Sequence, residues 1–129
     1  MRYLTVAEVL EINADLMGGQ AALRDRGLLE SAVARPQASA FGGDAYPDIV
    51  SKAAALLHSL VLDHPFVDGN KRTAVLAMLV FASLNGFQLR WDQKDALDFV
   101  LRLASGDVDL VDVIQFLRSR MRPKARGAR

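Results

Sequence analysis

A run of nine consecutive apolar residues, Ala74–Ala82, constrains the fold of this 129-residue chain more than any other feature. A helix that spans a bilayer needs about 20 apolar residues, so the run is too short to cross a membrane. It lies inside a helical pattern that begins near Asn70 and is closed by Gly86. Because a helix that is apolar on every side must be buried, the sequence predicts that this is the central helix of the fold.

Five further helices are predicted around the central one. The first follows Thr5, which has the pattern of a capping box with Glu8, and it ends before Gly18. Apolar residues at helical spacing predict four more helices, at about residues 25–35, 49–64, 92–104 and 109–121. In the helix over residues 92–104, the side chains expected to face inward are Ala96, Leu97, Val100 and Leu101. No convincing strand pattern is present, so the predicted fold class is all-α: a compact bundle of about six helices.

The length suits one domain, predicted over residues 1–121 and followed by a basic tail over residues 122–129. Six cations and no acidic residue occur in the last twelve residues. We interpret the tail as a solvated, disordered end, and we expect no direct binding to nucleic acid. The alternative is that the tail contacts nucleic acid, a ribosome or an acidic partner.

A long connection, Pro36–Pro47, separates the second and third predicted helices. It is small and polar except for Phe41 and Tyr46, and it shows neither a helical nor a strand period. Connections in compact domains are typically about 4 to 6 residues long, so this one is near twice the usual length. It is either a functional flap or a loop pinned by an aromatic side chain that packs on the core, and composition does not decide between them.

Composition excludes several classes of protein. The chain contains no cysteine, which rules out disulfide scaffolds and cysteine-ligated zinc or iron–sulfur sites. It contains two histidines, so a histidine-rich metal cage is not expected. The N-terminal segment carries acidic residues where a secretory signal would be apolar. We therefore expect a cytoplasmic protein that does not associate with membranes.

The segment His64–Arg72, with sequence HPFVDGNKR, places chemically active residues in one turn before the predicted central helix. The first turn of a helix offers unpaired N–H groups and the positive end of the helix dipole, which together favour an anion. Gly69 lets the backbone approach a ligand closely. Asn70 can donate its side-chain amide, and Lys71 and Arg72 add positive charge, so we expect these four residues to bind phosphate.

The same segment offers a metal ligand and a base. Asp68 is placed to hold Mg²⁺, which usually takes one or two carboxylates and completes its shell with water and phosphate oxygens; the alternative is a helix N-cap. His64 is the candidate base, because imidazole has an ordinary pKa close to neutral pH. We expect His58, in mid-helix, to be a hydrogen-bonded core residue, Phe66 to point into the core and Thr73 to pack within its helix.

These residues match H-x-F-x-[DE]-[AG]-N-[GK]-R, the motif of the Fic/Doc superfamily, and the sequence resembles in particular the Doc branch of type II toxin–antitoxin systems. The similarity continues through LRDRGLLESAVARPQ, FGG, KAAALLHSL and the NG after the central helix, and it covers most of residues 1–117. It implies the Fic/Doc fold, with His64 as the base and Asp68 as the Mg²⁺ ligand. The implied anchors for the phosphates of ATP are Gly69, Asn70, Lys71 and Arg72.

Position 71 indicates which chemistry the resemblance implies. Fic enzymes that attach AMP to protein hydroxyls have glycine there and a further arginine three residues after the motif arginine, where this chain has Val75. With Lys71, the chain resembles Doc, which implies a protein kinase that transfers the γ-phosphoryl group of ATP to a threonine of elongation factor Tu and halts translation. Two alternatives remain open: AMP transfer to a protein hydroxyl, and a non-enzymatic toxin that blocks ribosomes through its basic tail.

The resemblance also implies partners. In the family, the loop that corresponds to Pro36–Pro47 is a flap that aligns the target segment as an added strand. Many Fic proteins inhibit themselves through an [ST]-x-x-x-E-[GN] helix, but none of the glutamates here, Glu8, Glu11 and Glu30, is followed by glycine or asparagine. We therefore expect an external inhibitor, an antitoxin of the Phd type whose C-terminal segment folds into a groove on the toxin.

Overall fold

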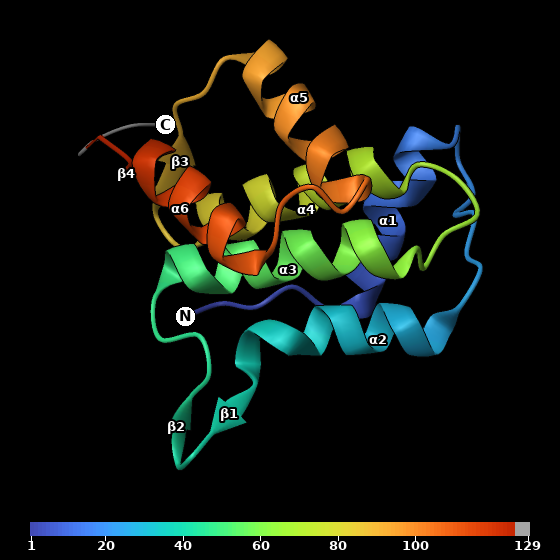
Figure 1. The fold of residues 1–129 in the computed structure, drawn as a ribbon. Coiled ribbons are helices and arrows are strands. Elements are labelled where there is room, and N and C mark those ends of the chain that lie inside the picture. The colour runs from blue at the N-terminus through green and yellow to red at the C-terminus, as the bar shows by residue number, and fades with distance from the viewer. Residues whose placement is uncertain (126–129) are drawn as a thin grey trace.

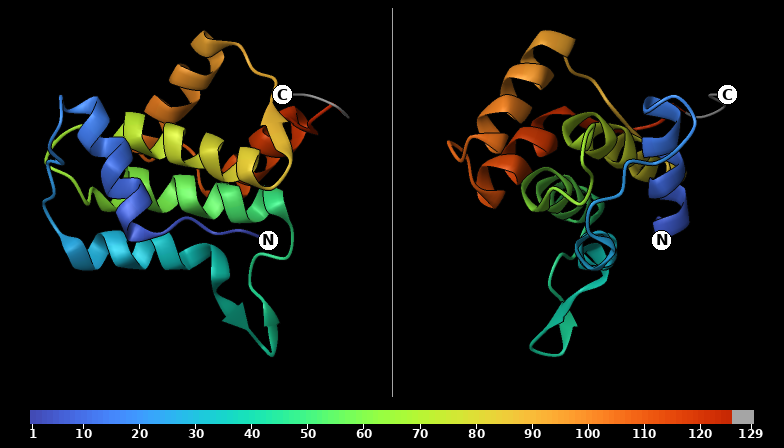
Figure 2. Two further views of the ribbon diagram at one scale, coloured as in Figure 1. Left: turned by 180° about the vertical axis from the view of Figure 1, so that it is seen from behind. Right: turned by 90° about the vertical axis from the view of Figure 1, so that its right-hand side faces the viewer.

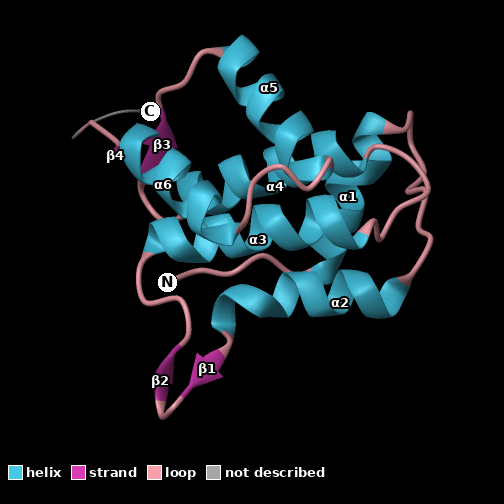
Figure 3. Cartoon of the chain, in the orientation of Figure 1, coloured by secondary structure: helices cyan, strands magenta, loops and turns pink. Residues whose placement is uncertain are grey.

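A computed structural model of the chain describes residues 1–125. Six α-helices account for most of them, as Figure 1 and Figure 3 show. The helices are α1 (Val6–Leu16), α2 (Arg26–Ala34), α3 (Ile49–Asp63), α4 (Asn70–Leu84), α5 (Gln93–Ala104) and α6 (Leu110–Arg120). The other elements are a 3-10 helix, η1 (Arg35–Gln37), and the strands β1 (Ser39–Ala40), β2 (Gly43–Asp44), β3 (Phe87–Leu89) and β4 (Met121–Pro123). The predicted all-α bundle is confirmed, with two small sheets added to it.

Side-chain caps explain where five of the six helices begin. Thr5 and Glu8 form the predicted capping box at α1, and Asp109 begins α6 in the same way. The caps of α2, α3 and α5 are Asp25, Asp48 and Asp92. Each cap accepts a hydrogen bond from an N–H group that the helix cannot satisfy itself. The exception is α4, which begins after Gly69 without a side-chain cap.

The central helix of the bundle is α3, not α4. Twelve of its fifteen residues are buried, and it contacts α2, α4, α5, α6 and η1. The right panel of Figure 2 looks nearly along α3, with α2, α4 and α6 around it. The prediction for Ala74–Ala82 is wrong in part: Met78 and Phe81 are buried, but Leu76 and Val80 are 38% and 39% exposed. Within residues 1–125, no helix has the length and apolar character needed to cross a bilayer.

The inward face of α5 also differs from the prediction. Ala96, Val100 and Leu103 are buried, whereas Leu97 and Leu101 are 58% and 46% exposed. The buried positions are four and three residues apart, so Leu97 and Leu101 each lie about 100° further round the helix than the buried residue before them. Leu97 borders a groove that α5 forms with α4.

Two antiparallel sheets complete the fold. β1 and β2 form a hairpin in which Ser39 lies opposite Asp44, and this hairpin projects from the helical body (Figure 1). β3 pairs with β4, so that Leu89 lies opposite Met121. Strands of two or three residues are too short to show an alternating pattern, which is why the sequence does not predict them.

Part of the predicted disordered tail is ordered against β3. Arg122 and Pro123 belong to β4. Lys124 donates its backbone N–H to the carbonyl of Gly86 at 2.9 Å and its Nζ atom to Ser83 Oγ at 2.6 Å. The disordered tail predicted from residue 122 therefore does not begin there, and residues 126–129 lie outside the described part of the chain.

Candidate functional site

The motif occupies the turn that joins the C-terminal end of α3 to the N-terminal end of α4. His64 is the residue after α3 and has φ 48° and ψ 58°, a left-handed conformation that is uncommon outside glycine. Pro65 follows directly and prevents the helix from continuing, as the sequence predicts. The side chain of His64 is exposed, as are those of Asp68, Lys71 and Arg72. The turn thus presents the candidate base, metal ligand and cations to solvent within nine residues of sequence.

Arg24 holds the backbone of His64, a contact that sequence reasoning missed. Its Nε donates to the carbonyl of His64 at 2.7 Å, and its Nη2 donates to the carbonyl of Asp63 at 3.0 Å. The guanidinium therefore caps the C-terminal end of α3, where carbonyl groups lack helical partners. The backbone N–H groups of Arg24 and Asp25 both donate to the carbonyl of Pro65. Only the tertiary structure reveals this role, because the partners are 39 and 40 residues apart in sequence.

The side chain of Asn70 closes the motif turn onto Phe66. Its Oδ1 accepts from the N–H of Phe66 at 3.0 Å, and its Nδ2 donates to the carbonyl of Phe66 at 2.8 Å. Phe66 is 1% exposed, so the prediction that its ring points into the core is confirmed. The Asn70 amide is engaged at both ends by the backbone, and one hydrogen on Nδ2 remains for a ligand.

Two features favour glycine at position 69. Its φ of 78° lies in the left-handed region that favours glycine. A Cβ atom there would also lie 2.7 Å from the Cε of Met17 and 3.2 Å from the Nδ2 of Asn13. Asp68 is not the N-cap of α4, because its Oδ1 accepts from the adjacent N–H of Gly69 at 2.8 Å. The first N–H groups of α4 therefore have no side-chain cap and remain open to an anion.

A buried amide, Asn13, connects this turn to α1. Its Nδ2 donates to the carbonyl of Asp68 at 3.1 Å and to Thr73 Oγ1 at 3.0 Å, and its Oδ1 accepts from the N–H of Ala22 at 2.8 Å. Asn13 and Thr73 are both fully buried, which confirms that Thr73 packs within its helix. The signal in the sequence is a polar residue one turn after buried Val9 on the inward face of α1.

Two cations that form no ion pair in the described part of the chain lie at the open end of α4. Lys71 and Arg72 are exposed on the first turn of α4. The ion pairs within residues 1–125 are Arg2–Glu8, Lys52–Asp44 and Arg118–Asp48. Neither Lys71 nor Arg72 takes part in them. Their charges add to the positive end of the helix dipole, so the site attracts an anion.

The donor set near the motif fits a metal ion that arrives with phosphate. In the described part of the chain, no three histidine or acidic side chains gather into a metal site. Asp68 offers one exposed carboxylate, of which only Oδ1 accepts a hydrogen bond in the described residues. Mg²⁺ usually binds one or two carboxylates and takes its other ligands from water and phosphate. Asp68 therefore fits a Mg²⁺ ion bound together with a nucleotide better than a metal centre made of protein ligands alone.

An apolar groove beside the two cations lies between α4 and α5. It encloses about 380 Å³. The residues that line it include Lys71, Arg72, Leu76, Trp91 and Leu97. Leu76 and Leu97 are among the large apolar side chains that the fold leaves exposed. We call this feature the α4–α5 groove.

Arg35 ties the connection after η1 to α3. Its Nη1 donates to His58 Nδ1 at 2.9 Å and to Ser59 Oγ at 2.8 Å, and its Nε donates to the hydroxyl of Tyr46 at 2.9 Å. His58 is hydrogen-bonded, as predicted, but half-buried and not fully in the core. Burial lowers the pKa of His58, and the nearby Arg35 charge lowers it further. Because a guanidinium can only donate hydrogen bonds, Nδ1 of His58 is the acceptor in this contact.

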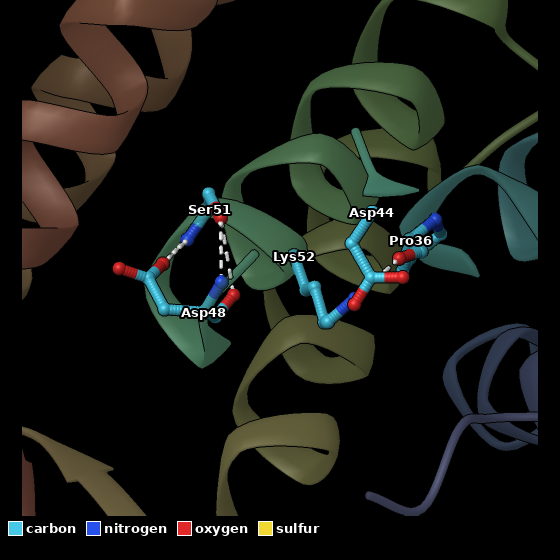
Figure 4. Close-up of polar contacts among 5 residues, drawn as sticks. All are labelled: Pro36, Asp44, Asp48, Ser51 and Lys52. Carbon is cyan, nitrogen blue, oxygen red and sulfur yellow. Dashed lines mark hydrogen bonds and ion pairs between the residues drawn. The ribbon is translucent and has the colours of Figure 1, made fainter. Parts of the chain in front are cut away.

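The Pro36–Pro47 connection is a hairpin fixed at its base. Lys52 of α3 is 3% exposed, and its Nζ donates to the carbonyl of Pro36 at 3.1 Å and pairs with Asp44 Oδ2 at 3.5 Å. In Figure 4 the end of this lysine points toward Asp44 and Pro36, on the side away from the cap that Asp48 forms with Ser51 at the start of α3. Phe41 is fully exposed between the two strands, with φ 53°. Phe41 thus does not pin the loop to the core, whereas the Tyr46 hydroxyl is held by Arg35.

The fold and the site define a class: a helical domain in which a His-Pro turn carries an acidic residue, a glycine and two cations to the open end of a helix. The sequence model of the Fic/DOC family matches residues 3–82, and the chain belongs to that family. It is 48% identical over 110 residues to the Toxin Doc of Mycolicibacterium smegmatis, covering 84% of this chain and 85% of that protein. It is 29% identical over 121 residues to the Protein kinase doc of Escherichia phage P1, covering 92% of this chain and 94% of that protein.

Proposed function

We propose that this protein is the toxin of a toxin–antitoxin pair and acts in the cytoplasm as a Doc-type protein kinase. It would transfer the γ-phosphoryl group of ATP to a threonine hydroxyl of a translation factor, with elongation factor Tu as the expected target, and thereby halt translation. The observation that carries the proposal is that Lys71 and Arg72, on the uncapped first turn of α4, form no ion pair within residues 1–125. The names of the two relatives, Toxin Doc and Protein kinase doc, support it.

Each motif residue has a role in this proposal. The open N–H groups after Gly69, together with Lys71 and Arg72, bind the phosphates. The carboxylate of Asp68 holds Mg²⁺, which when bound offsets the negative charge of the phosphates. The exposed imidazole of His64 accepts the proton of the attacking hydroxyl. Asn70 keeps the turn in shape through its two hydrogen bonds to Phe66.

Transfer of AMP is the second candidate. Fic-type AMP transfer is associated with glycine at position 71 and an arginine at position 75, and this chain has lysine and valine. Val75 lines the α4–α5 groove and supplies no charge to a phosphate. The lysine side chain occupies space that glycine would leave open and adds a phosphate ligand, so we favour transfer of the γ-phosphoryl group.

A Phd-like antitoxin is the expected inhibitor, and the α4–α5 groove is where we expect its C-terminal segment to bind. An amphipathic helix could bury its apolar face against exposed Leu76 and Leu97. Because Lys71 and Arg72 are among the residues that line the groove, its occupant would contact residues that bind phosphate. Restraint by a separate protein agrees with the missing inhibitory glutamate motif in this chain.

Labelled ATP tests the proposal. The protein is incubated with a bacterial lysate and ATP labelled at either the γ or the α phosphate. We expect label on a protein the size of elongation factor Tu from γ-labelled ATP only, and a loss of about 10²- to 10⁴-fold in His64→Ala. Label from the α position alone would replace the kinase with an AMP transferase. Toxicity that survives His64→Ala would favour the non-enzymatic alternative.

A further inference from the structure

We propose that Asn13 is a positioning residue that fixes the backbone of Asp68 for metal binding, an inference that rests on the proposed function. Asn13 lies in α1, 55 residues before Asp68, and is fully buried. Its side chain touches neither the expected ligand nor solvent. Any effect on the site must therefore pass through the groups to which it is hydrogen-bonded.

The hydrogen-bond inventory of Asn13 is complete. An asparagine amide has two N–H hydrogens on Nδ2 and one acceptor oxygen. Nδ2 donates to the carbonyl of Asp68 and to Thr73 Oγ1, and Oδ1 accepts from the N–H of Ala22. No buried side-chain polar atom in the described residues lacks a partner. One side chain thus connects α1, the Ala22 segment, the motif turn and α4.

The bond to the Asp68 carbonyl restrains the peptide that precedes the glycine of the turn. The peptide between Asp68 and Gly69 precedes a glycine with φ 78°, and glycine has the widest conformational freedom of any residue. Asp68 has no other side-chain partner than the N–H of Gly69 within residues 1–125. The direction of its carboxylate therefore depends on the backbone that Asn13 holds.

Thr73 provides a matched control. It is as buried as Asn13 and accepts from the same Nδ2 atom, but its bond does not involve the motif turn. Thr73→Val removes that bond and leaves the bond between Asn13 and Asp68 in place. Asn13→Leu removes both Nδ2 bonds, and also the bond from the N–H of Ala22, while keeping a side chain of similar size. A residue that only stabilises the fold would give the same result in both variants once their stabilities are matched.

The test measures binding of a fluorescent ATP analogue as Mg²⁺ is titrated, without turnover. We expect Asn13→Leu to raise the Mg²⁺ concentration for half-maximal binding at least tenfold and Thr73→Val to raise it less than threefold. In an Asp68→Ala background, Asn13→Leu should lower the affinity for the analogue less than twofold. Equal effects of the two single variants, or an Asn13 effect that persists without the Asp68 carboxylate, would overturn the inference.

A measurement on the wild-type chain keeps the test informative if Asn13→Leu does not fold. The N–H of Ala22 donates to Asn13, so its hydrogen exchange should slow when Mg²⁺ and ATP are added together. If the chain binds Mg²⁺ and ATP but the exchange of the Ala22 N–H does not change, the role of Asn13 is contradicted while the proposed function is not. A wild-type chain that shows no Mg²⁺-dependent binding of the analogue would overturn the proposed function, and this inference with it.

Discussion

The backbone of Gly69 lies against the thioether of Met17, so that an added Cβ would approach the Met17 Cε within 2.7 Å. Met17 follows α1 and Gly69 precedes α4, so the contact sets how closely the first helix approaches the motif turn. Glycine adopts this positive φ without strain, whereas a Cβ here would be strained and would force the end of the Met17 side chain to shift. The motif glycine therefore has a packing role in addition to any contact with a ligand.

Gly69→Ala should destabilise the protein and weaken nucleotide binding. A left-handed alanine costs about 1–2 kcal/mol, and the contact with Met17 adds to that cost. Met17→Ala in the same chain should relieve the contact but not the backbone strain. Urea unfolding of the single and double variants measures both parts. If Gly69→Ala were as stable as the wild type, the conformation described for Gly69 would be wrong.

Asn70→Asp should reduce both stability and nucleotide binding. The substitution replaces the donor to the Phe66 carbonyl by a carboxylate oxygen, and the loss of this half-buried hydrogen bond should cost about 1 kcal/mol or more. Asn85 is a matched control, because its Nδ2 donates to the Phe81 carbonyl at the same spacing and the same 2.8 Å, at the other end of α4.

Asn85→Asp should therefore lose stability but keep its affinity for ATP. Thermal unfolding and ATP titration, made side by side on the two variants, provide the comparison. Equal losses of affinity in both would mean that the Asn70 bonds matter to the site only through global stability.

Lys71→Ala should weaken ATP binding about tenfold, because a charge-assisted hydrogen bond contributes about 1.5–3 kcal/mol and part of that is lost to solvent. The loss should shrink at high salt, which screens exposed charges. Lys94, an exposed lysine in the first turn of α5, is the control, and Lys94→Ala should leave affinity unchanged. Isothermal titration at two salt concentrations distinguishes a local phosphate contact from a general effect of net charge.

Folding stability should fall as the pH is lowered below 6.5. Burial and the Arg35 charge lower the pKa of His58 from its ordinary 6.5, while Asp63 and Asp109 act to raise it. The unfolded chain therefore takes up this proton before the folded chain does. The stability that neutral His58 contributes is present above pH 6.5 and is lost as the pH falls through the folded-state pKa.

Urea unfolding at pH 7.5 and 5.5 measures this dependence. His58→Gln, which keeps an acceptor for Arg35 without an ionisable group, should flatten it. His64→Gln is the control, because it removes the other histidine of the chain and leaves the contact between Arg35 and His58 intact. If His58→Gln kept the wild-type pH dependence of folding stability, the dependence would come from titratable groups other than His58.

Truncation at two positions should distinguish the contribution of residues 122–125 from that of residues 126–129. A chain ending at residue 125 keeps β4 and the Lys124 contacts, so its stability and toxicity in bacteria should match the full chain. A chain ending at residue 121 loses the pairing of Arg122 and Pro123 with β3 and should unfold at a lower temperature. Toxicity lost on removing residues 126–129 alone would support a role of the tail in binding.

Local sequence patterns predicted the helix ends that depend on residues close together in sequence. The cap of α1 at Thr5 and Glu8 and the end of α3 at His64 follow from contacts within about four residues. Apolar spacing found the helices, but it could not tell which side of an apolar helix faces a neighbour. Leu76 and Leu97 were therefore assigned to the interior although they border the α4–α5 groove.

Contacts between distant segments could not be predicted in the same way. Arg24 and Asn13 support the motif turn from residues 40 and 55 positions away in sequence. Nothing near either residue identifies its partner. The motif residues of the site could be identified because they are contiguous in sequence. Arg24 and Asn13, which support them, could not be identified, because only the fold brings them next to the motif.

The missing side-chain cap at the N-terminus of α4 should affect the stability of the protein when no ligand is bound. Five helices of the described chain begin with a side-chain cap from the protein itself. At α4, a bound anion would accept the N–H hydrogen bonds that a cap accepts elsewhere. Without a bound anion, local unfolding of α4 should begin at its N-terminus. A bound anion should reduce this unfolding, because it accepts hydrogen bonds from the free N–H groups there. Ligand concentration would then govern how long the toxin survives proteolysis as well as how fast it works.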